Sequence, residues 1–187
     1  MVSLSILYPL IALITALVWV LCGLTVGVST ALAAAMLLTA VLLSLTAIDL
    51  DHQLLPDSLT LPLLWIGLLI NINATFVTLE SAVLGAVFGY LSLWSVYWLF
   101  KVITGKEGMG YGDFKLLAAL GAWFGVSALP TIVLLSSLVG AIVGLGLIAT
   151  GRQGRETPMP FGPFLAGAGL IHLFYPDSLM GWIAGTL

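Results

Sequence analysis

The chain has 187 residues, of which 61% are hydrophobic and 7% are charged, and its net charge is −3. Soluble domains carry roughly 25% charged residues, so this composition excludes a water-exposed globular surface and indicates an integral membrane protein. No block of basic residues suggests a nucleic-acid partner. The single cysteine, Cys22, excludes an internal disulfide and a cysteine-based zinc cluster. We expect one all-α, polytopic transmembrane domain over residues 1–187, embedded in a lipid bilayer.

Seven apolar runs, taken in chain order, predict about seven transmembrane helices. A helix needs about 20 apolar residues to cross the hydrocarbon core of a bilayer. Four runs reach that length and three are shorter, so a count of six or eight stays open. The long runs are Leu4–Gly27, Ser29–Ile48, Ala82–Ile103 and Thr131–Ala149, and the short runs are Leu59–Ile72, Phe114–Val126 and Phe161–Phe174.

The basic residues predict the orientation of these helices. Seven helices place three loops on one side of the membrane, and every Lys and Arg lies in or beside those loops. Cytoplasmic loops are enriched in Lys and Arg, so we predict that this side is cytoplasmic and that the N-terminus lies there too. The basic residues are Lys101, Lys106, Lys115, Arg152 and Arg155.

Most acidic residues lie on the same side, and two of them stand at helix ends. Asp49 ends the second predicted helix and Asp113 opens the fifth, so folding could bring the two carboxylates together. Acids are common at helix N-termini, where the helix dipole and free N–H groups favour them. Capping alone could therefore explain Asp113, and it explains Asp57 well, while Asp51 is expected in a solvated loop. Asp49 lies at a helix C-terminus, where negative charge is disfavoured, and this makes it a functional candidate.

The segment GMGYGDFK, Gly108–Lys115, supplies a second observation. Gly110 and Gly112 flank Tyr111 immediately before Asp113. Glycine permits a positive φ and lets another backbone come close, which a site that cuts a peptide requires. A GxGD pattern alone is weak, but a second interfacial acid on another helix strengthens it considerably.

Two neighbouring aspartates have a definite chemical use. Like charges a few ångströms apart cannot both ionise cheaply, so the pair shares one proton. The ionised member activates a water molecule, and the protonated member protonates the leaving amine. This chemistry requires no metal, and neither His52 nor His172 has a partner at metal-ligand spacing.

Three blocks of the sequence closely resemble the bacterial type IV prepilin peptidases, which are GxGD-type aspartic proteases of the inner membrane. The blocks are AIDLDHQLLPDSLTLPLLW (Ala47–Trp65), GKEGMGYGDFKLLAALGAWFG (Gly105–Gly125) and PMPFGPFLAGAGLI (Pro158–Ile171). The resemblance implies cleavage of the basic leader from type IV prepilins or type II secretion pseudopilins, after a glycine and at the cytoplasmic membrane face. It also implies that Asp49 and Asp113 are the catalytic residues.

The resemblance also bears on supporting residues and cofactors. The residues expected to bind substrate or to support the motifs are Gly110, Tyr111, Gly112, Lys115, Pro56, Asp57 and Glu107. The cysteine-rich segment that family members usually carry is missing, and Ala12 stands where an acid is usual, as in a trimmed chain or a natural short form. The peptidase reaction implies no cofactor. Members that methylate the product use S-adenosylmethionine, and we expect that activity to be absent or weak here.

Other functions stay open. A presenilin-like protease would place GxGD inside a helix, and a proton-coupled transporter would also use paired intramembrane acids. We find no internal repeat of the Asp49 or Asp113 motif, and such repeats are common in transporters. A structural membrane subunit could use the spacing of Gly85 and Gly89 for helix contact, although packing within the chain explains this spacing more simply. The oligomeric state and the particular pilin are not predicted.

Overall fold

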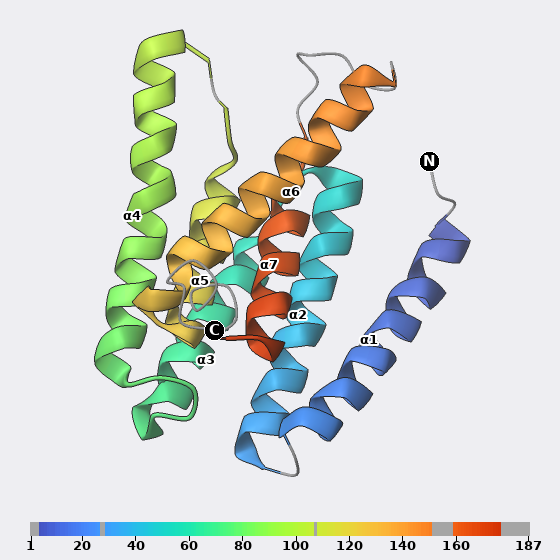
Figure 1. Ribbon diagram of the computed structural model, residues 1–187, viewed down its shortest axis with the longest axis vertical. Helices are drawn as coiled ribbons and strands as arrows, with labels where there is room; N and C mark the ends of the chain where they lie inside the picture. The colour runs from blue at the N-terminus through green and yellow to red at the C-terminus, as the bar shows by residue number, and fades with distance from the viewer. Residues whose placement is uncertain (1–3, 27–28, 107, 151–158, 177–187) are drawn as a thin grey trace, which may run out of the picture.

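The computed structural model describes residues 4–26, 29–106, 108–150 and 159–176 (Figure 1). Within these ranges the chain is all-α, which confirms the predicted fold class. Each of the seven predicted runs corresponds to one α-helix, and two short 3₁₀ turns complete the described structure. The elements are α1 (Leu4–Val26), α2 (Thr30–His52), α3 (Asp57–Ile70), η1 (Asn71–Asn73), α4 (Leu79–Thr104), α5 (Tyr111–Phe124), η2 (Val126–Ala128), α6 (Leu129–Ala149) and α7 (Gly162–Phe174).

Among the residues that the structure describes, three segments are long and apolar enough to cross a membrane by length and composition. They are α2, α4 and the stretch Val126–Ala149, which joins η2 to α6. Many large apolar side chains on the helices are exposed, as expected where lipid rather than water is the surrounding medium. The chain is therefore an all-α membrane protein, as its composition predicts.

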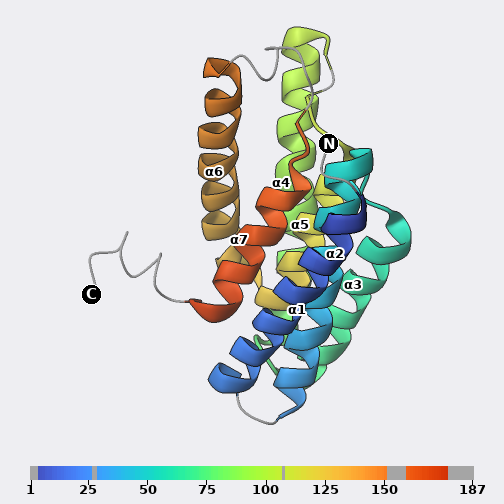
Figure 2. The same cartoon turned by 90° about the vertical axis from the view of Figure 1, so that its right-hand side faces the viewer.

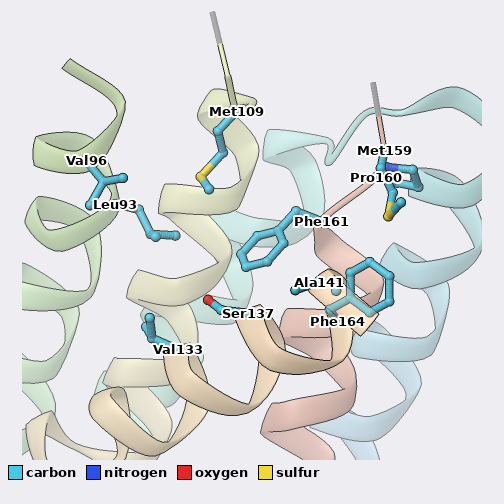
Figure 3. Close-up of a pocket in the computed structure, with 11 residues that line it drawn as sticks. Leu93, Val96, Met109, Val133, Ser137, Ala141, Met159, Pro160, Phe161 and Phe164 are labelled. Carbon is cyan, nitrogen blue, oxygen red and sulfur yellow. The ribbon is translucent and has the colours of Figure 1, made fainter. Parts of the chain in front are cut away.

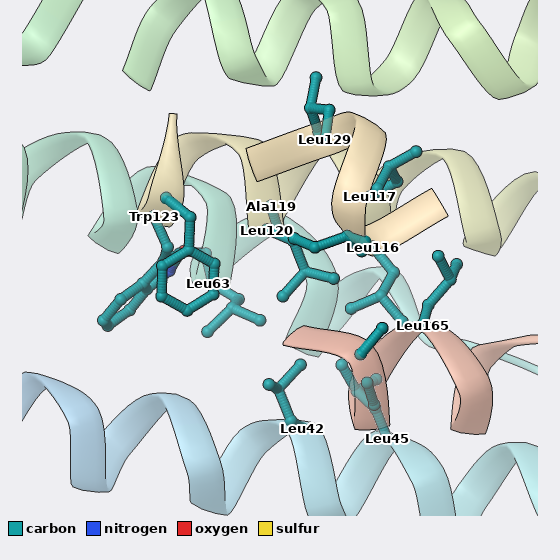
Figure 4. Packing of buried hydrophobic residues seen from close by; sticks show 14 of the residues in the cluster. Leu42, Leu45, Leu63, Leu116, Leu117, Ala119, Leu120, Trp123, Leu129 and Leu165 are labelled. Carbon is teal, nitrogen blue, oxygen red and sulfur yellow. The ribbon is translucent and has the colours of Figure 1, made fainter. Parts of the chain in front are cut away.

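Helix α5 lies at the centre of the bundle, between α3, α4 and α7. Every residue from Leu116 to Phe124 is buried, so this helix is apolar on all sides. Figure 4 shows its leucines packed against side chains from α2, α3 and α7, including Leu42, Leu63 and Leu165. The enclosure of α5 explains why a helix of only 14 residues keeps a fixed position in the bundle.

The backbones of α4 and α5 touch at two glycines. A Cβ atom built on Gly85 would overlap the carbonyl oxygen of Gly121, and a Cβ atom on Gly121 would overlap that of Gly85. On the same face of α4, a Cβ on Gly89 would lie 2.7 Å from the Leu117 carbonyl oxygen. The small-residue spacing on α4 thus serves packing within the chain, as the simpler interpretation predicts.

A buried asparagine fixes the C-terminal end of α5. The Asn71 side-chain amide donates hydrogen bonds to the carbonyl oxygens of Ala122, at 2.9 Å, and Trp123, at 3.0 Å. The Asn71 Oδ1 atom accepts hydrogen bonds from the N–H groups of Phe76 and Val77. The last carbonyl groups of a helix lack hydrogen-bond donors within the helix, and the Asn71 side chain supplies donors for two of them. With this end anchored, the opposite end of α5 is held in place too.

Helix α6 has a different environment from α5. It packs mainly against α7, and only four of its residues are buried: Leu129, Thr131, Ile132 and Ser136. Figure 2 shows α6 along one side of the bundle, with α7 beside it. Large side chains such as Leu134, Ile142 and Leu145 are exposed along its length. This helix therefore faces the bilayer over most of its surface.

Candidate active site

Asp49 and Asp113 line one cavity at the end of the bundle where α2 and α4 end and α5 begins, which we call the charged end. The cavity, here called the dyad cavity, has a volume of about 820 Å³. Asp49 is 5% exposed and Asp113 is 6% exposed, so both carboxylates are buried in its wall. The charge of Asp49 is close enough to act on Asp113. Folding thus brings together the two acids that the sequence separates by 64 positions (113 − 49 = 64).

Asp49 lies in the last turn of α2, three residues before the helix ends at His52. The helix dipole alone would disfavour a negative charge there. The backbone N–H of Gly162 donates a hydrogen bond to Asp49 Oδ2 at 3.0 Å. Because Gly162 is the first residue of α7, the positive end of that helix faces the carboxylate. The N-terminus of α7 thus offsets the unfavourable position of Asp49 on α2.

Asp113 is the third residue of α5, and it is supported by its own helix. Gly110 is the N-cap residue, and its backbone amide is hydrogen-bonded to the Asp113 carboxylate. The Asp113 N–H donates in turn to the Gly110 carbonyl oxygen at 3.2 Å. This arrangement resembles half of a capping box, with the Gly110 carbonyl in place of an N-cap side chain. Asp113 therefore has the capping role that the sequence allows, and it also lines the dyad cavity.

The interpretation of the GYGD segment as a turn with positive φ is wrong. Gly110 has a φ of −78°, and Gly112 lies inside α5, which begins at Tyr111. Gly112 is instead required for close packing, because a Cβ atom there would lie 2.6 Å from Leu55 Cβ. Leu55 belongs to the segment between α2 and α3, and it is buried. Gly112 therefore lets the segment between α2 and α3 pack closely against the first turn of α5.

Asp57 does not cap α3, contrary to the prediction. Pro56 is the N-cap residue, with φ −69° and ψ 135°, and α3 begins at Asp57. The Asp57 carboxylate forms an ion pair with Lys115, whose Nζ lies 2.6 and 2.7 Å from its two oxygens. Both residues line the dyad cavity, so this pair joins α3 to α5 at the edge of the cavity. The physical reason for the difference is that a cation on α5 competes successfully for the Asp57 side chain.

The remaining predicted residues have different outcomes. Tyr111 lines the dyad cavity, and its hydroxyl donates to the Tyr97 hydroxyl at 3.4 Å. Lys101 Nζ also donates to the Tyr97 hydroxyl, at 3.2 Å, so Tyr97 links α4 to the wall of the cavity. Asp51 is exposed in the last turn of α2, not in a loop, and does not line the cavity. Glu107, together with Glu156, lies outside the described residues.

Sequence reasoning did not assign a role to Gly162, Tyr97 or Phe161, all of which contact or line the site. Gly162 and Phe161 lie within the PMPFGPF block, which marked their neighbourhood but not their contacts. Tyr97 gives no local signal, because it is one of many aromatic residues in an apolar helix. Among the residues that the structure describes, no group of three or more His, Cys, Asp or Glu side chains could hold a metal ion.

Comparison with known proteins identifies a family that matches this chain. The model of the type IV leader peptidase family matches residues 36–145, which include both aspartates. No solved structure matches the chain.

Curated relatives match nearly the whole chain. Proteins named prepilin leader peptidase/N-methyltransferase are 57% identical in Aeromonas salmonicida, 59% in Aeromonas hydrophila and 56% in Pseudomonas aeruginosa. These matches cover 99%, 94% and 92% of the chain, respectively, but only 64%, 60% and 59% of the relatives. The chain thus spans less than two thirds of the length of these relatives. The chain belongs to the type IV leader peptidase family.

Proposed function

We propose that this chain is a membrane aspartic endopeptidase that removes the leader peptide from type IV prepilins or type II secretion pseudopilins. The observation that carries the proposal is the pair of buried carboxylates, Asp49 and Asp113, that two separate helices present to one cavity. Membership of the leader peptidase family and the names of the relatives support the same substrate class. The scissile bond follows the glycine that ends the leader, as the resemblance implies.

The two aspartates would divide the chemistry between them. A helix N-terminus faces each carboxylate, that of α7 at Asp49 and that of α5 at Asp113, and we assign Asp49 as the base. Asp49 takes a proton from water while the water oxygen attacks the carbonyl carbon of the scissile peptide. Asp113 carries the shared proton, hydrogen-bonds the carbonyl oxygen and then protonates the leaving amine. This division requires neither a metal nor another cofactor for cleavage.

We also propose that the charged end faces the cytoplasm in the bacterial inner membrane. Lys101, Lys106 and Lys115 lie at or near this end, whereas residues 71–78 and 125–128 at the opposite end contain no Lys or Arg. This asymmetry follows the rule that cytoplasmic loops carry the positive charge. Prepilin leaders are made in the cytoplasm, so this orientation would give them access to the dyad cavity.

The acidic residues of the charged end offer limited attraction to a basic leader. Asp57 is paired with Lys115, and Asp51 lies outside the dyad cavity. Attraction of a basic leader would then rest on Glu107 and Glu156, which lie outside the described residues, and on the dyad itself. Methyl transfer, which the relatives' names include, is not part of the proposal, and its absence or weakness stays a prediction.

Incubation of the purified protein with a prepilin, followed by N-terminal sequencing of the product, tests the proposed function. We expect a new N-terminus directly after the leader glycine, and no product from the Asp49→Asn or Asp113→Asn variant. A proton-uptake assay in liposomes separates this function from transport. Proton uptake that depends on Asp49 and Asp113, without any cleavage, would overturn the proposal.

A further inference from the structure

A second cavity, lined almost entirely by apolar side chains, lies next to the dyad cavity. It has a volume of about 360 Å³, and we call it the apolar groove. Figure 3 shows Leu93 and Val96 of α4 on one side, with Ser137 and Ala141 of α6 and Phe164 of α7 on the other. The peptidase chemistry assigned to Asp49 and Asp113 makes no use of these residues.

The apolar groove adjoins the dyad cavity and shares part of its wall. Four residues line both cavities: Met109, Met159, Pro160 and Phe161. Figure 3 shows the Phe161 ring between the α4 and α6 sides of the groove. A chain that extends from the carboxylates along this shared wall would reach the groove next.

The position of the groove along α4 gives its direction. Phe100 lines the dyad cavity, whereas Val96 and Leu93 line the groove. These residues lie four and seven positions earlier on the same helix, which corresponds to about 6 and 10 Å along its axis. The groove thus leads from the charged end toward the apolar middle of the bundle.

The apolar groove also opens sideways, between α4 and α6. Val96 is 56% exposed, and Ser137 and Ala141 are exposed as well. Small residues on α6 leave room on this side, because a Cβ atom on Gly140 would lie 3.3 Å from the Phe164 ring and one on Gly144 would lie 3.1 Å from Met159. A helix already embedded in the bilayer could therefore reach the groove laterally.

We propose that the apolar groove binds the first apolar residues of the substrate after the scissile glycine. This inference rests on the proposed function, and the family resemblance implies that a long apolar helix follows the leader glycine. The leader would then lie in the dyad cavity and the apolar segment in the groove. Asp49 and Asp113 would cut the chain at the junction between the two. The shared wall of the two cavities, the apolar lining and the lateral opening all fit this occupant.

A large side chain introduced into the groove tests the proposal when cleavage of two substrates is compared. The first is a full-length prepilin, and the second is a short peptide that ends two residues after the leader glycine. We expect Ala141→Phe to raise the apparent KM for the prepilin by about 10- to 100-fold, the equivalent of losing the burial of one large apolar side chain. Cleavage of the short peptide should change less than about twofold. Ala149→Phe, an exposed position on the same helix outside the groove, should affect neither substrate.

The outcomes of this comparison are distinct. If wild-type protein cleaves neither substrate, the proposed function fails, and this inference fails with it. If wild-type protein cleaves the prepilin normally and Ala141→Phe does too, the groove does not bind substrate and the inference alone is overturned. Equal loss on both substrates would also overturn it, because the substitution would then act on the catalytic centre.

Cross-linking gives a second readout that does not depend on turnover. The protein would carry Asp113→Asn, Cys22→Ala and Ser137→Cys, and the prepilin would carry one cysteine within its first apolar turns. We expect a disulfide with Ser137→Cys and none with Leu145→Cys, a position 68% exposed on α6 and outside the groove. Equal cross-linking at both positions, or cross-linking at Leu145→Cys alone, would contradict the proposal. A lipid retained in the groove while prepilin fails to cross-link would identify the occupant as an acyl chain instead.

Discussion

The C-terminal end of α2 and the N-terminal end of α5 present the same side chain in opposite electrostatic settings. Asp113 lies where its own helix favours an acid, and its hydrogen bonds involve Gly110, three residues away. Asp49 lies where its own helix disfavours an acid, and its partner is Gly162, 113 residues away. The first carboxylate is therefore placed by local structure, whereas the second depends on the docking of α7.

Removing either carboxylate should have the largest effect on cleavage. Asp49→Asn and Asp113→Asn keep the size of the side chain but remove a group that exchanges protons. We expect each to lower kcat by about 10²–10⁴-fold or more, the usual contribution of general acid–base catalysis. Because the two residues act as one unit, the double variant should resemble either single variant.

The control for these variants is Asp51→Asn, since Asp51 is exposed and lies outside the dyad cavity. It should cleave a prepilin at nearly the normal rate. An inactive Asp51→Asn together with an active Asp49→Asn would show that the first carboxylate is assigned two residues too early.

Gly162→Ala tests whether the position of Asp49 depends on α7. A Cβ atom there would lie 2.6 Å from Asp49 Oδ2 and 3.0 Å from Leu55, so the carboxylate or α7 must move. A displacement of about 1 Å at a catalytic group can cost about 10²-fold in rate. We expect a loss of that order in kcat, measured on a prepilin, with the protein still inserted in the membrane.

The matched control is Gly167→Ala on the same helix, where an added Cβ atom meets no neighbour within 4 Å. Alanine also has the higher helix propensity, so this variant should be at least as stable as wild type. Comparable losses from both substitutions would mean that α7 tolerates no change, and that Gly162 has no particular connection to Asp49.

Gly112→Val tests the local side of the comparison. The larger side chain would collide with Leu55, and it would push the first turn of α5 away from the α2–α3 segment. Since Asp113 keeps its own cap at Gly110, we expect a smaller loss, about tenfold, in kcat for prepilin cleavage. Gly146→Val on α6, where a Cβ atom meets nothing within 4 Å, serves as the control. Normal cleavage by folded Gly112→Val would show that this contact does not position Asp113.

Breaking the ion pair at the edge of the dyad cavity should have the smallest effect. The Lys115 side chain is 27% exposed and that of Asp57 is 57% exposed, and exposed pairs contribute only about 0.2–1 kcal/mol. Asp57→Asn and Lys115→Met should each change kcat/KM by at most about fivefold, and added salt should reduce the difference from wild type. A loss as large as that of Asp49→Asn would place the pair among the catalytic groups.

The helices and the two aspartates could be predicted from the sequence because each depends on local features. A bilayer demands apolar runs, so Ser29–Ile48 and Ala82–Ile103 identify α2 and α4 to within a few residues. Asp49 and Asp113 stand out because an acid at the edge of such a run needs an explanation.

Contacts between distant segments could not be predicted in the same way. The ion pair of Asp57 joins residues 58 positions apart, and the hydrogen bond of Gly162 spans 113 positions. A sequence with local capping signals favours a cap for Asp57, and only the packing of α3 against α5 brings Lys115 within reach. The helical conformation of Gly112 could not be predicted either, because glycines before an apolar run are equally typical of a turn.

The first turn of α5 lies well below the end of α4, and this position constrains the conformation of a substrate. The segment after α4 runs back along that helix before α5 begins (Figure 1), and a Cβ atom on Gly108 would lie 2.8 Å from the Phe100 ring. The Phe114 ring packs against Tyr97, seven residues before α4 ends at Thr104, which is about 10 Å along the helix axis. An extended chain covers that distance in about three residues. Under the proposed function, a substrate would therefore need about three extended residues to bring its scissile bond to the carboxylates.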